Sequence, residues 1–389
     1  MLRVGIVAGE LSGDYLGAGL MRELRALEPD VHFEGIGGER MQAEGMDSLY
    51  PLETLSVMGL AEVLRHLPGL LRIRRNLVRR FLADPPDLFI GVDAPDFNLG
   101  LERRLKAAAI PTVHYVSPTV WAWRQGRVKT IRRAVDLMLS IFPFEADFLR
   151  RHDVPVTFVG HPLADEIPLE PDQPEARRAL QLEIRRDELL VAMLPGSRMS
   201  EVTALGPVFL ETAAWLRQRT SNLRFVVPCA TPAIEDELRR QLAAVPDSQD
   251  LALVRGRSRE CMEAANAVLL ASGTASLECM LYKRPMVVAY RVSGVTAWLA
   301  RRLVRVPHFA MPNLIAGRRL VGEYAQEDAV PERLGPAMLE LLDRPELRAE
   351  LQESFLEIHR LLRRDASREA ALAVQRLVRK GMPPAHAAG

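Results

Sequence analysis

Two short loops rich in glycine and hydroxyl residues have the composition of an anion-binding site. The first loop follows the apolar run 189–194 and contains Gly196, Ser197 and Arg198. Small residues let backbone N–H groups approach an anion, and an arginine adds charge-assisted hydrogen bonds to it. This loop is therefore a candidate phosphate site.

The second loop follows the apolar run 267–271 and contains Ser272, Gly273 and Thr274, with Glu278 one turn later. A carboxylate at that place can accept hydrogen bonds from the vicinal hydroxyls of a ribose, as an acidic residue does in dinucleotide-binding folds. Together the two loops predict a site for a nucleotide-sugar diphosphate.

Asp93 follows a third apolar run, residues 88–92, and is a candidate catalytic base. A carboxylate at the end of a buried strand, partly shielded from water, can remove a proton from an attacking hydroxyl. The alternative is that Asp93 forms a turn before Pro95, and Asp96 is expected to cap the next helix.

The end of the first strand carries polar residues between two glycines. Glu10, Ser12 and Asp14 are candidate substrate contacts, with Gly9 and Gly13 keeping the turn open. The spacing is not GxGxxG, so a dinucleotide fingerprint is absent. The alternative is that Ser12 or Asp14 only caps the following helix.

Asn313 is a further candidate contact to the donor sugar or diphosphate, together with Arg318. The alternative is turn formation, which the spacing does not exclude.

Two basic and apolar segments, residues 57–80 and 298–305, are candidates for contact with an anionic membrane surface. The alternative is a pair of core helices whose arginines reach solvent. No apolar stretch has the roughly 20 residues that a helix needs to cross a bilayer. The first residues do not read as a secretory signal, so we expect a protein that is soluble or bound at a membrane surface in a reducing compartment.

The composition is that of a globular protein large enough for two domains. Of 389 residues, 48% are hydrophobic and 26% charged, and the formal net charge of +1 does not suggest nucleic acid as a partner. The three cysteines, Cys229, Cys261 and Cys279, lack the spacing of a disulfide framework or a zinc site.

Short apolar runs alternate with amphipathic stretches along the chain, which is typical of α/β domains with parallel sheets. The predicted strands cover residues 2–8, 31–35, 88–92, 112–116, 137–141, 156–159, 189–194, 224–228, 251–254, 268–271 and 286–290. The proline-rich segment 161–174 is the expected linker, and the chain is expected to be helical after about residue 330.

This pattern predicts two Rossmann-like doubly wound domains facing a cleft. We expect domains at 1–165 and 166–360, and a C-terminal helix at 361–381 that packs back across them. Ligands of open parallel sheets bind beyond the carboxyl ends of the strands, which is where the candidate residues lie.

In combination these motifs resemble the lipid-A-disaccharide synthase family over nearly the whole chain. The resemblance implies a two-domain glycosyltransferase of the GT-B type, with the acceptor on the N-terminal domain and the UDP-linked donor on the C-terminal one. The matching stretches are AGELSGD, MQAEGM, GVDAPDFN, HYVSPTVWAWRQGRV, FVGHPLAD, LPGSRMSEV, ASGTASLECML, RPMVVAYR and PNLIAGRRLV.

The resemblance also implies the substrates and the place of action. The donor would be UDP-2,3-diacylglucosamine, the acceptor 2,3-diacylglucosamine 1-phosphate, and the product a β-1,6-linked disaccharide formed with inversion. The enzyme would work peripherally on the cytoplasmic face of the inner membrane of a Gram-negative cell. No DxD motif is evident in the sequence, so we expect it to work without metal or other cofactor. A second copy of the chain is kept as a candidate partner.

The base role of Asp93 and the ligand contacts of Glu10, Arg198, Asn313 and Glu278 agree with this resemblance. Two other classes remain open: a UDP-N-acetylglucosamine 2-epimerase, which needs no lipid acceptor, and a non-catalytic nucleotide-sugar binding protein.

Overall fold

A computed structural model of the chain describes residues 1–55, 60–122, 125–182, 184–185, 188–245, 251–292 and 307–381, with residues 60–66, 125, 380 and 381 described for their backbone alone. The described chain divides into two compact units. Unit 1 comprises residues 1–165 and 362–389, and unit 2 comprises residues 166–361.

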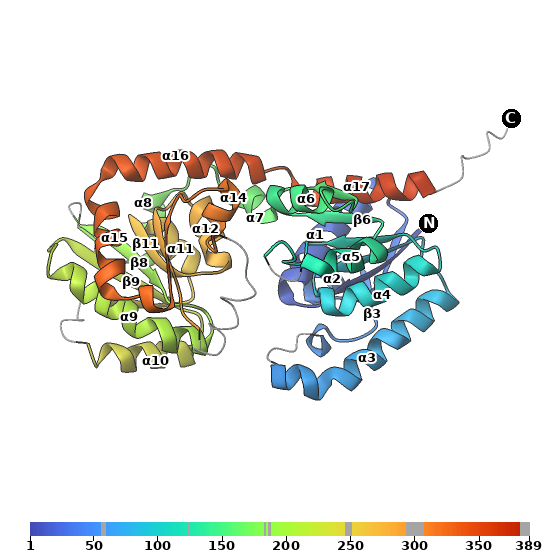
Figure 1. Ribbon diagram of the computed structural model, residues 1–389, viewed down its shortest axis with the longest axis horizontal. Coiled ribbons are helices and arrows are strands. Elements are labelled where there is room, and N and C mark those ends of the chain that lie inside the picture. Colours follow the sequence, from blue (N-terminus) through green and yellow to red (C-terminus); the bar gives the residue numbers. More distant parts are fainter. Residues whose placement is uncertain are drawn as a thin grey trace. The chain divides into compact units, whose positions relative to one another are not determined.

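Unit 1 is built on a sheet with helices around it (Figure 1). The strands are parallel, in the order β3-β2-β1-β4-β5-β6-β7. Its strands are β1 (Leu2–Ala8), β2 (Val31–Ile36), β3 (Met46–Ser48), β4 (Leu88–Val92), β5 (Thr112–Tyr115), β6 (Leu137–Ser140) and β7 (Val156–Phe158). Strands β2 and β3 lie on one side of β1, and β4 to β7 lie on the other, so the strand order switches between β1 and β4. Doubly wound sheets bind ligands in the crevice at such a switch point.

Helices connect the strands of unit 1 and cover the sheet. They are α1 (Leu11–Leu27), α2 (Glu39–Ala43), α3 (Leu60–Ala83), α4 (Pro95–Ala107), α5 (Val128–Ala134), α6 (Pro143–Arg150), α7 (Pro162–Glu166) and α17 (Ala366–Gly381), with 3-10 turns at Leu52–Thr54 and Gln125–Arg127. Phe81 of α3 and Leu101 and Leu105 of α4 are buried in one core cluster with Phe89 of β4. Burial of these apolar faces fixes α3 and α4 beside the end of β4.

Unit 2 repeats the scheme with strand order β10-β9-β8-β11-β12-β13. Its strands are β8 (Leu189–Leu194), β9 (Leu223–Cys229), β10 (Leu251–Arg255), β11 (Ala267–Ala271), β12 (Met286–Tyr290) and β13 (Gly322–Ala325). Its helices are α8 (Gln173–Leu180), α9 (Met199–Arg217), α10 (Pro232–Leu242), α11 (Ser258–Ala264), α12 (Thr274–Leu281), α14 (Met311–Ala316), α15 (Pro331–Asp343) and α16 (Pro345–Leu362), with a 3-10 turn at Gln326–Asp328. Here the switch point lies between β8 and β11.

These two sheets confirm the prediction of two Rossmann-like doubly wound domains with a helical C-terminal segment. Every predicted strand is present within a residue or so of its expected bounds. The sequence did not predict β3 or β13, which are short edge strands. The expected linker is not free of structure, because it contains α7 and the start of α8.

The last helix, α17, belongs to unit 1, where it packs along α1. The carboxylate of Asp165 accepts hydrogen bonds from the N–H groups of Asp365 and Ala366, at 2.8 and 2.7 Å, and so satisfies the free amides at the start of α17. At the other end, Gln375 donates to Glu28 just after α1. Residues from both ends of the chain therefore complete the same unit.

Candidate functional site

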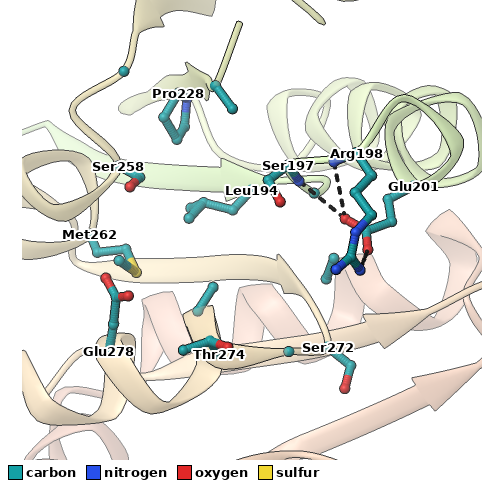
Figure 2. A pocket seen from close by; sticks show the side chains of 16 residues that line it. Leu194, Ser197, Arg198, Glu201, Pro228, Ser258, Met262, Ser272, Thr274 and Glu278 are labelled. Carbon is teal, nitrogen blue, oxygen red and sulfur yellow. Dashed lines mark hydrogen bonds and ion pairs between the residues drawn. The ribbon is translucent and has the colours of Figure 1, made fainter. Parts of the chain in front are cut away.

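A pocket of about 360 Å³ lies at the carboxyl ends of the strands of unit 2 (Figure 2). The loops that follow β8, β9, β10 and β11 all contribute to its wall. The pocket is lined by Leu194, Gly196, Ser197, Arg198, Glu201, Pro228, Ala230, Gly256, Ser258, Met262, Ala271, Ser272, Gly273, Thr274, Ala275 and Glu278. The structure thus brings together the two glycine loops that the sequence singled out.

The loop after β8 is held by a carboxylate of the same chain. Glu201 accepts hydrogen bonds from the N–H groups of Ser197 and Arg198, at 3.1 and 3.3 Å, and the guanidinium of Arg198 lies 3.2 Å from its other oxygen. Gly196 has a φ of 133°, and a Cβ there would overlap Glu201. The N–H groups of this loop therefore bind a negatively charged group in the structure, although the group is a side chain.

The loop after β11 opens α12 and carries Glu278 into the pocket. Gly273 has a φ of 154°, and Thr274 is the first residue of α12. The hydroxyl of Ser272 donates to the carbonyl oxygen of Phe309, at 3.2 Å. Figure 2 shows the side chain of Glu278 rising from α12 toward Met262.

The carboxylate of Glu278 is largely shielded from water. Its side chain is 19% exposed, and one oxygen lies 3.5 Å from Nε of Arg259. Burial raises the pKa of Glu278, and the nearby Arg259 guanidinium opposes that rise. A carboxylate that is shielded from water and has only one cationic neighbour can accept hydrogen bonds from hydroxyl groups of a ligand.

Glu201, Ser258 and Arg259 are pocket residues or partners of pocket residues that sequence reasoning missed. A glutamate three residues after the N-cap residue, here Arg198, is the signal of a capping box, and it could have identified Glu201. Ser258 and Arg259 follow β10 at a turn where Arg257 has a φ of 55°, and no motif marks that turn.

Asn313 does not line this pocket, and its amide is engaged elsewhere. The side chain is fully buried, its oxygen accepts from the N–H groups of Leu320 and Val321, and its nitrogen donates to the carbonyl oxygen of Val321. These bonds match the turn-forming alternative that the sequence left open. In the structure Asn313 holds the turn between α14 and β13.

Asp93 lies at the switch point of unit 1 in a conformation that few residues adopt. Asp93 and Ala94 have φ values of 52° and 43°, in the left-handed region. Asn98, which is fully buried, donates to the carbonyl oxygen of Asp93 at 2.8 Å, and the N–H of Asp93 donates to the carbonyl oxygen of Tyr115. Non-glycine residues in this region are strained, and the surrounding hydrogen bonds hold the turn in place.

The same turn explains the glycine at the end of β1. A Cβ at Gly9 would overlap the Cβ of Ala94. Only glycine lets the loop after β1 approach the Asp93–Ala94 turn this closely. Gly9 therefore allows the ends of β1 and β4 to form one site.

A cavity of about 310 Å³ lies against this turn. Its polar side includes Asp93 and Glu10, and its apolar side comes from α3. The residues that line it are Glu10, Leu55, Leu67, Leu70, Leu71, Arg74, Asp93, Ala94, Pro95, Asp96 and Phe97. Leu67 and Leu71 are 40% and 37% exposed, so this part of the apolar wall is accessible to solvent.

Ser12 and Asp14 are not among the residues that line this cavity. Ser12 is exposed in the first turn of α1. Asp14 is 2% exposed and accepts hydrogen bonds from the N–H groups of Gly38, Arg40 and Met41. Asp14 therefore caps α2. The alternative interpretation had expected it to cap α1, the helix in which it lies.

Asp96 lies in the first turn of α4 and pairs with Arg127 at 2.5 Å, while Ala94 holds the N-cap position.

Of the two basic and apolar segments, only the first lies largely within the described residues. Residues 298–305 lie outside the described residues. Residues 60–80 lie in the single long helix α3, whose C-terminal half packs into the core through Leu77, Val78 and Phe81. The alternative of a core helix therefore applies to that half. In the described part of the chain, no helix is long and apolar enough to cross a membrane, and no cluster of His, Cys, Asp and Glu could hold a metal ion.

Comparison with known proteins relates the chain to one family over nearly its whole length. The family model described as lipid-A-disaccharide synthetase matches residues 4–377. Proteins named lipid-A-disaccharide synthase from Chromohalobacter salexigens and Azotobacter vinelandii are 57% and 55% identical to this chain. Each alignment covers 98% of this chain and 99% of the relative.

Solved structures resemble the chain in fold at much lower identity. A UDP-GlcNAc 2-epimerase from Neisseria meningitidis, bound to UDP-GlcNAc, aligns with a TM-score of 0.62 and 11% identity over 97% of this chain and 100% of that one. A UDP-forming α,α-trehalose-phosphate synthase from Burkholderia vietnamiensis aligns with a TM-score of 0.60 and 16% identity over 98% of both chains.

Proposed function

The chain belongs to the lipid-A-disaccharide synthetase family, and from that premise we propose which of its residues carry out the reaction. It is a glycosyltransferase that acts in forming the lipid A disaccharide, from a UDP-sugar donor and a lipid acceptor. In more detail, the donor is UDP-2,3-diacylglucosamine and the acceptor is 2,3-diacylglucosamine 1-phosphate.

Asp93 acts as the general base toward the acceptor. The 6-hydroxyl of the acceptor attacks the anomeric carbon on the face opposite UDP, and Asp93 takes the proton from this hydroxyl. The observation that carries this assignment is the fixed left-handed turn at the switch point, which presents the carboxylate to a cavity with an apolar wall. That wall, formed by Leu67, Leu70 and Leu71, suits an acyl chain.

The pocket of unit 2 binds the UDP part of the donor. Glu278 accepts hydrogen bonds from the ribose hydroxyls, while Gly196, Ser197 and Arg198 contact the diphosphate, joined by Ser272, Gly273 and Thr274 from the opposite loop. The diphosphate competes with Glu201 for the N–H groups and for Arg198. As the bond to the sugar breaks, charge grows on the diphosphate, and Arg198 and these N–H groups stabilise it.

Mass spectrometry of the reaction mixture tests this function directly. The purified protein is incubated in detergent with UDP-2,3-diacylglucosamine and 2,3-diacylglucosamine 1-phosphate, with and without a chelator. We expect the disaccharide 1-phosphate and UDP in equal amounts, and no effect of the chelator. Conversion of the donor in the absence of acceptor would indicate a 2-epimerase, and an unconsumed donor would indicate a binding protein.

The exposed part of α3 contacts an anionic membrane surface, at the cytoplasmic face of the inner membrane. Support comes from the exposed Leu67 and Leu71 beside Arg72 and Arg75, since apolar and cationic side chains together favour interfacial binding. Replacing Arg72 and Arg75 by glutamine should reduce co-sedimentation with vesicles of anionic lipid. Replacing the exposed Arg132 and Arg133 of α5 is the matched control. A second copy of the chain remains a candidate partner, which light scattering of the detergent-free protein will test.

A further inference from the structure

Arg74 differs from the other arginines of α3 because it lines the cavity beside Asp93. Its side chain crosses to α4, where one nitrogen donates to the carbonyl oxygen of Asp96 at 3.4 Å. The guanidinium lies over Gly100, and a Cβ at that glycine would come within 2.6 Å of Nη1. Because Gly100 has no side chain, there is room for the guanidinium at this position.

Arg74 shares the cavity with the carboxylates of Glu10, Asp93 and Asp96, and two further guanidinium groups lie near it on α4. Arg103 and Arg104 lie three and four residues after Gly100, on the same face of α4. Burial and these two guanidinium groups lower the pKa of Arg74. Asp96, the acidic residue at the start of α4, already pairs with Arg127, and the ion pairs of the described residues include none to Arg74.

An arginine with no ion-pair partner among the described residues can bind an anion that enters the cavity. Guanidinium binds phosphate through parallel N–H···O hydrogen bonds, and the interaction is stronger where water is partly excluded. In a glucosamine ring, C1 and C5 are the two carbons bonded to the ring oxygen, and C6 is attached to C5. A sugar whose 6-hydroxyl lies at Asp93 therefore presents a phosphate on C1 close by, within the same cavity.

We propose that Arg74 binds the phosphomonoester on C1 of the acceptor and so determines acceptor specificity. This inference rests on the proposed function, because it takes the acceptor bound at Asp93 to be a sugar 1-phosphate. The positive charges of Arg103 and Arg104 increase the affinity of the site for an anion. Gly100 leaves space for the guanidinium of Arg74 because it has no Cβ.

Calorimetry with two acceptors tests the role of Arg74 without turnover. The probes are 2,3-diacylglucosamine 1-phosphate and its dephosphorylated counterpart, both with short acyl chains. We expect the wild-type protein to bind the phosphorylated probe about 10- to 100-fold more tightly, which corresponds to hydrogen bonds with a charged group. In Arg74→Gln this ratio should fall close to one, because affinity for the phosphorylated probe is lost and affinity for the other is kept.

Three further variants separate recognition from folding. Arg74→Lys should keep part of the ratio, because lysine carries the charge without the paired donors. Gly100→Ala should lower the ratio by displacing the guanidinium while every charge is retained. Arg79→Gln, an exposed arginine on the same helix that does not line the cavity, should keep the wild-type ratio.

The outcomes distinguish this inference from the proposed function. Equal affinity of the wild-type protein for both probes, or an equal loss for both in Arg74→Gln, would overturn the role of Arg74. If Arg74→Gln does not fold, an unchanged ratio in both Arg74→Lys and Gly100→Ala would overturn it as well. Disaccharide formation by the wild-type protein, followed by mass spectrometry, would still stand in each case. The absence of disaccharide would refute the proposed function instead.

Discussion

Replacing Asp93 with asparagine is the sharpest test of the assigned base, since the structure separates its effect on catalysis from any effect on folding. Two hydrogen bonds fix the turn through backbone atoms of Asp93, one to Tyr115 and one from Asn98. Among the described residues, no hydrogen bond or ion pair involves the carboxylate. Asparagine also adopts the left-handed region readily. We therefore expect stability to change by no more than about 0.5 kcal/mol.

The expected loss of rate is that of a missing general base. Positioned bases contribute about 10²- to 10⁴-fold, which is roughly 3 to 5 kcal/mol of the activation barrier. The amide cannot take the proton, so the loss should appear in kcat. UDP affinity should be unchanged, because Asp93 belongs to unit 1 and the UDP pocket is built from unit 2.

Steady-state release of UDP from the donor measures kcat, and calorimetry with UDP measures donor affinity. Asp96→Asn is the matched control, because this carboxylate borders the same cavity but is paired with Arg127. Loss of that exposed pair costs at most about 1 kcal/mol, so its rate should fall by less than about fivefold. Wild-type turnover in Asp93→Asn, or a loss equal to that of Asp96→Asn, would refute the assignment of the base.

Other variants examine the donor pocket, the turn and the core. Arg198→Ala should weaken UDP binding by about 10- to 100-fold in calorimetry, and unchanged affinity would place the phosphate elsewhere. Gly9→Ala should lower kcat by about tenfold or more, with UDP affinity retained, because the new methyl group pushes on Ala94; normal kcat would show that the turn tolerates this displacement. Burial raises the pKa of Glu145 from 4.5 to about 8, against hydrogen bonds from Ser140, Trp121 and the backbone at Phe142. Stability that is present below pH 4.5 is therefore lost as the pH rises through about 8, and Glu145→Gln should raise the melting temperature by a few degrees at pH 9 but not at pH 5. The same difference at both pH values would contradict this linkage.

The sequence predicted the elements whose apolar pattern is continuous. Buried central strands such as β4 and β11 consist almost entirely of apolar residues, so their bounds follow from composition. The edge strands β3 and β13 were missed because they are short and contain polar residues, whereas the edge strands β7 and β10 are mainly apolar. Their conformation depends on the adjacent strand more than on their own residues.

The candidate site was predictable where a residue follows a strand directly, as Asp93 and Ser272 do. It was not predictable where a side chain acts on a distant segment. Asp14 caps a helix that begins 25 residues later, and Asn313 holds a turn seven residues away. Arg74 reaches its place because Gly100, on another helix, leaves room for it. Such pairings depend on how helices pack, and no local spacing encodes them.

The attachment of α17 to α1 bears on how the chain folds during synthesis. The ribosome releases α17 only after all of unit 2 has been made. Unit 2 is one continuous segment of the chain, whereas unit 1 cannot complete its fold until its last helix has been synthesised. Until then, the surface of α1 around Gly19, which later meets Ser367, is left uncovered. A nonsense mutation near the end of the gene would thus damage the half of the enzyme that begins the chain.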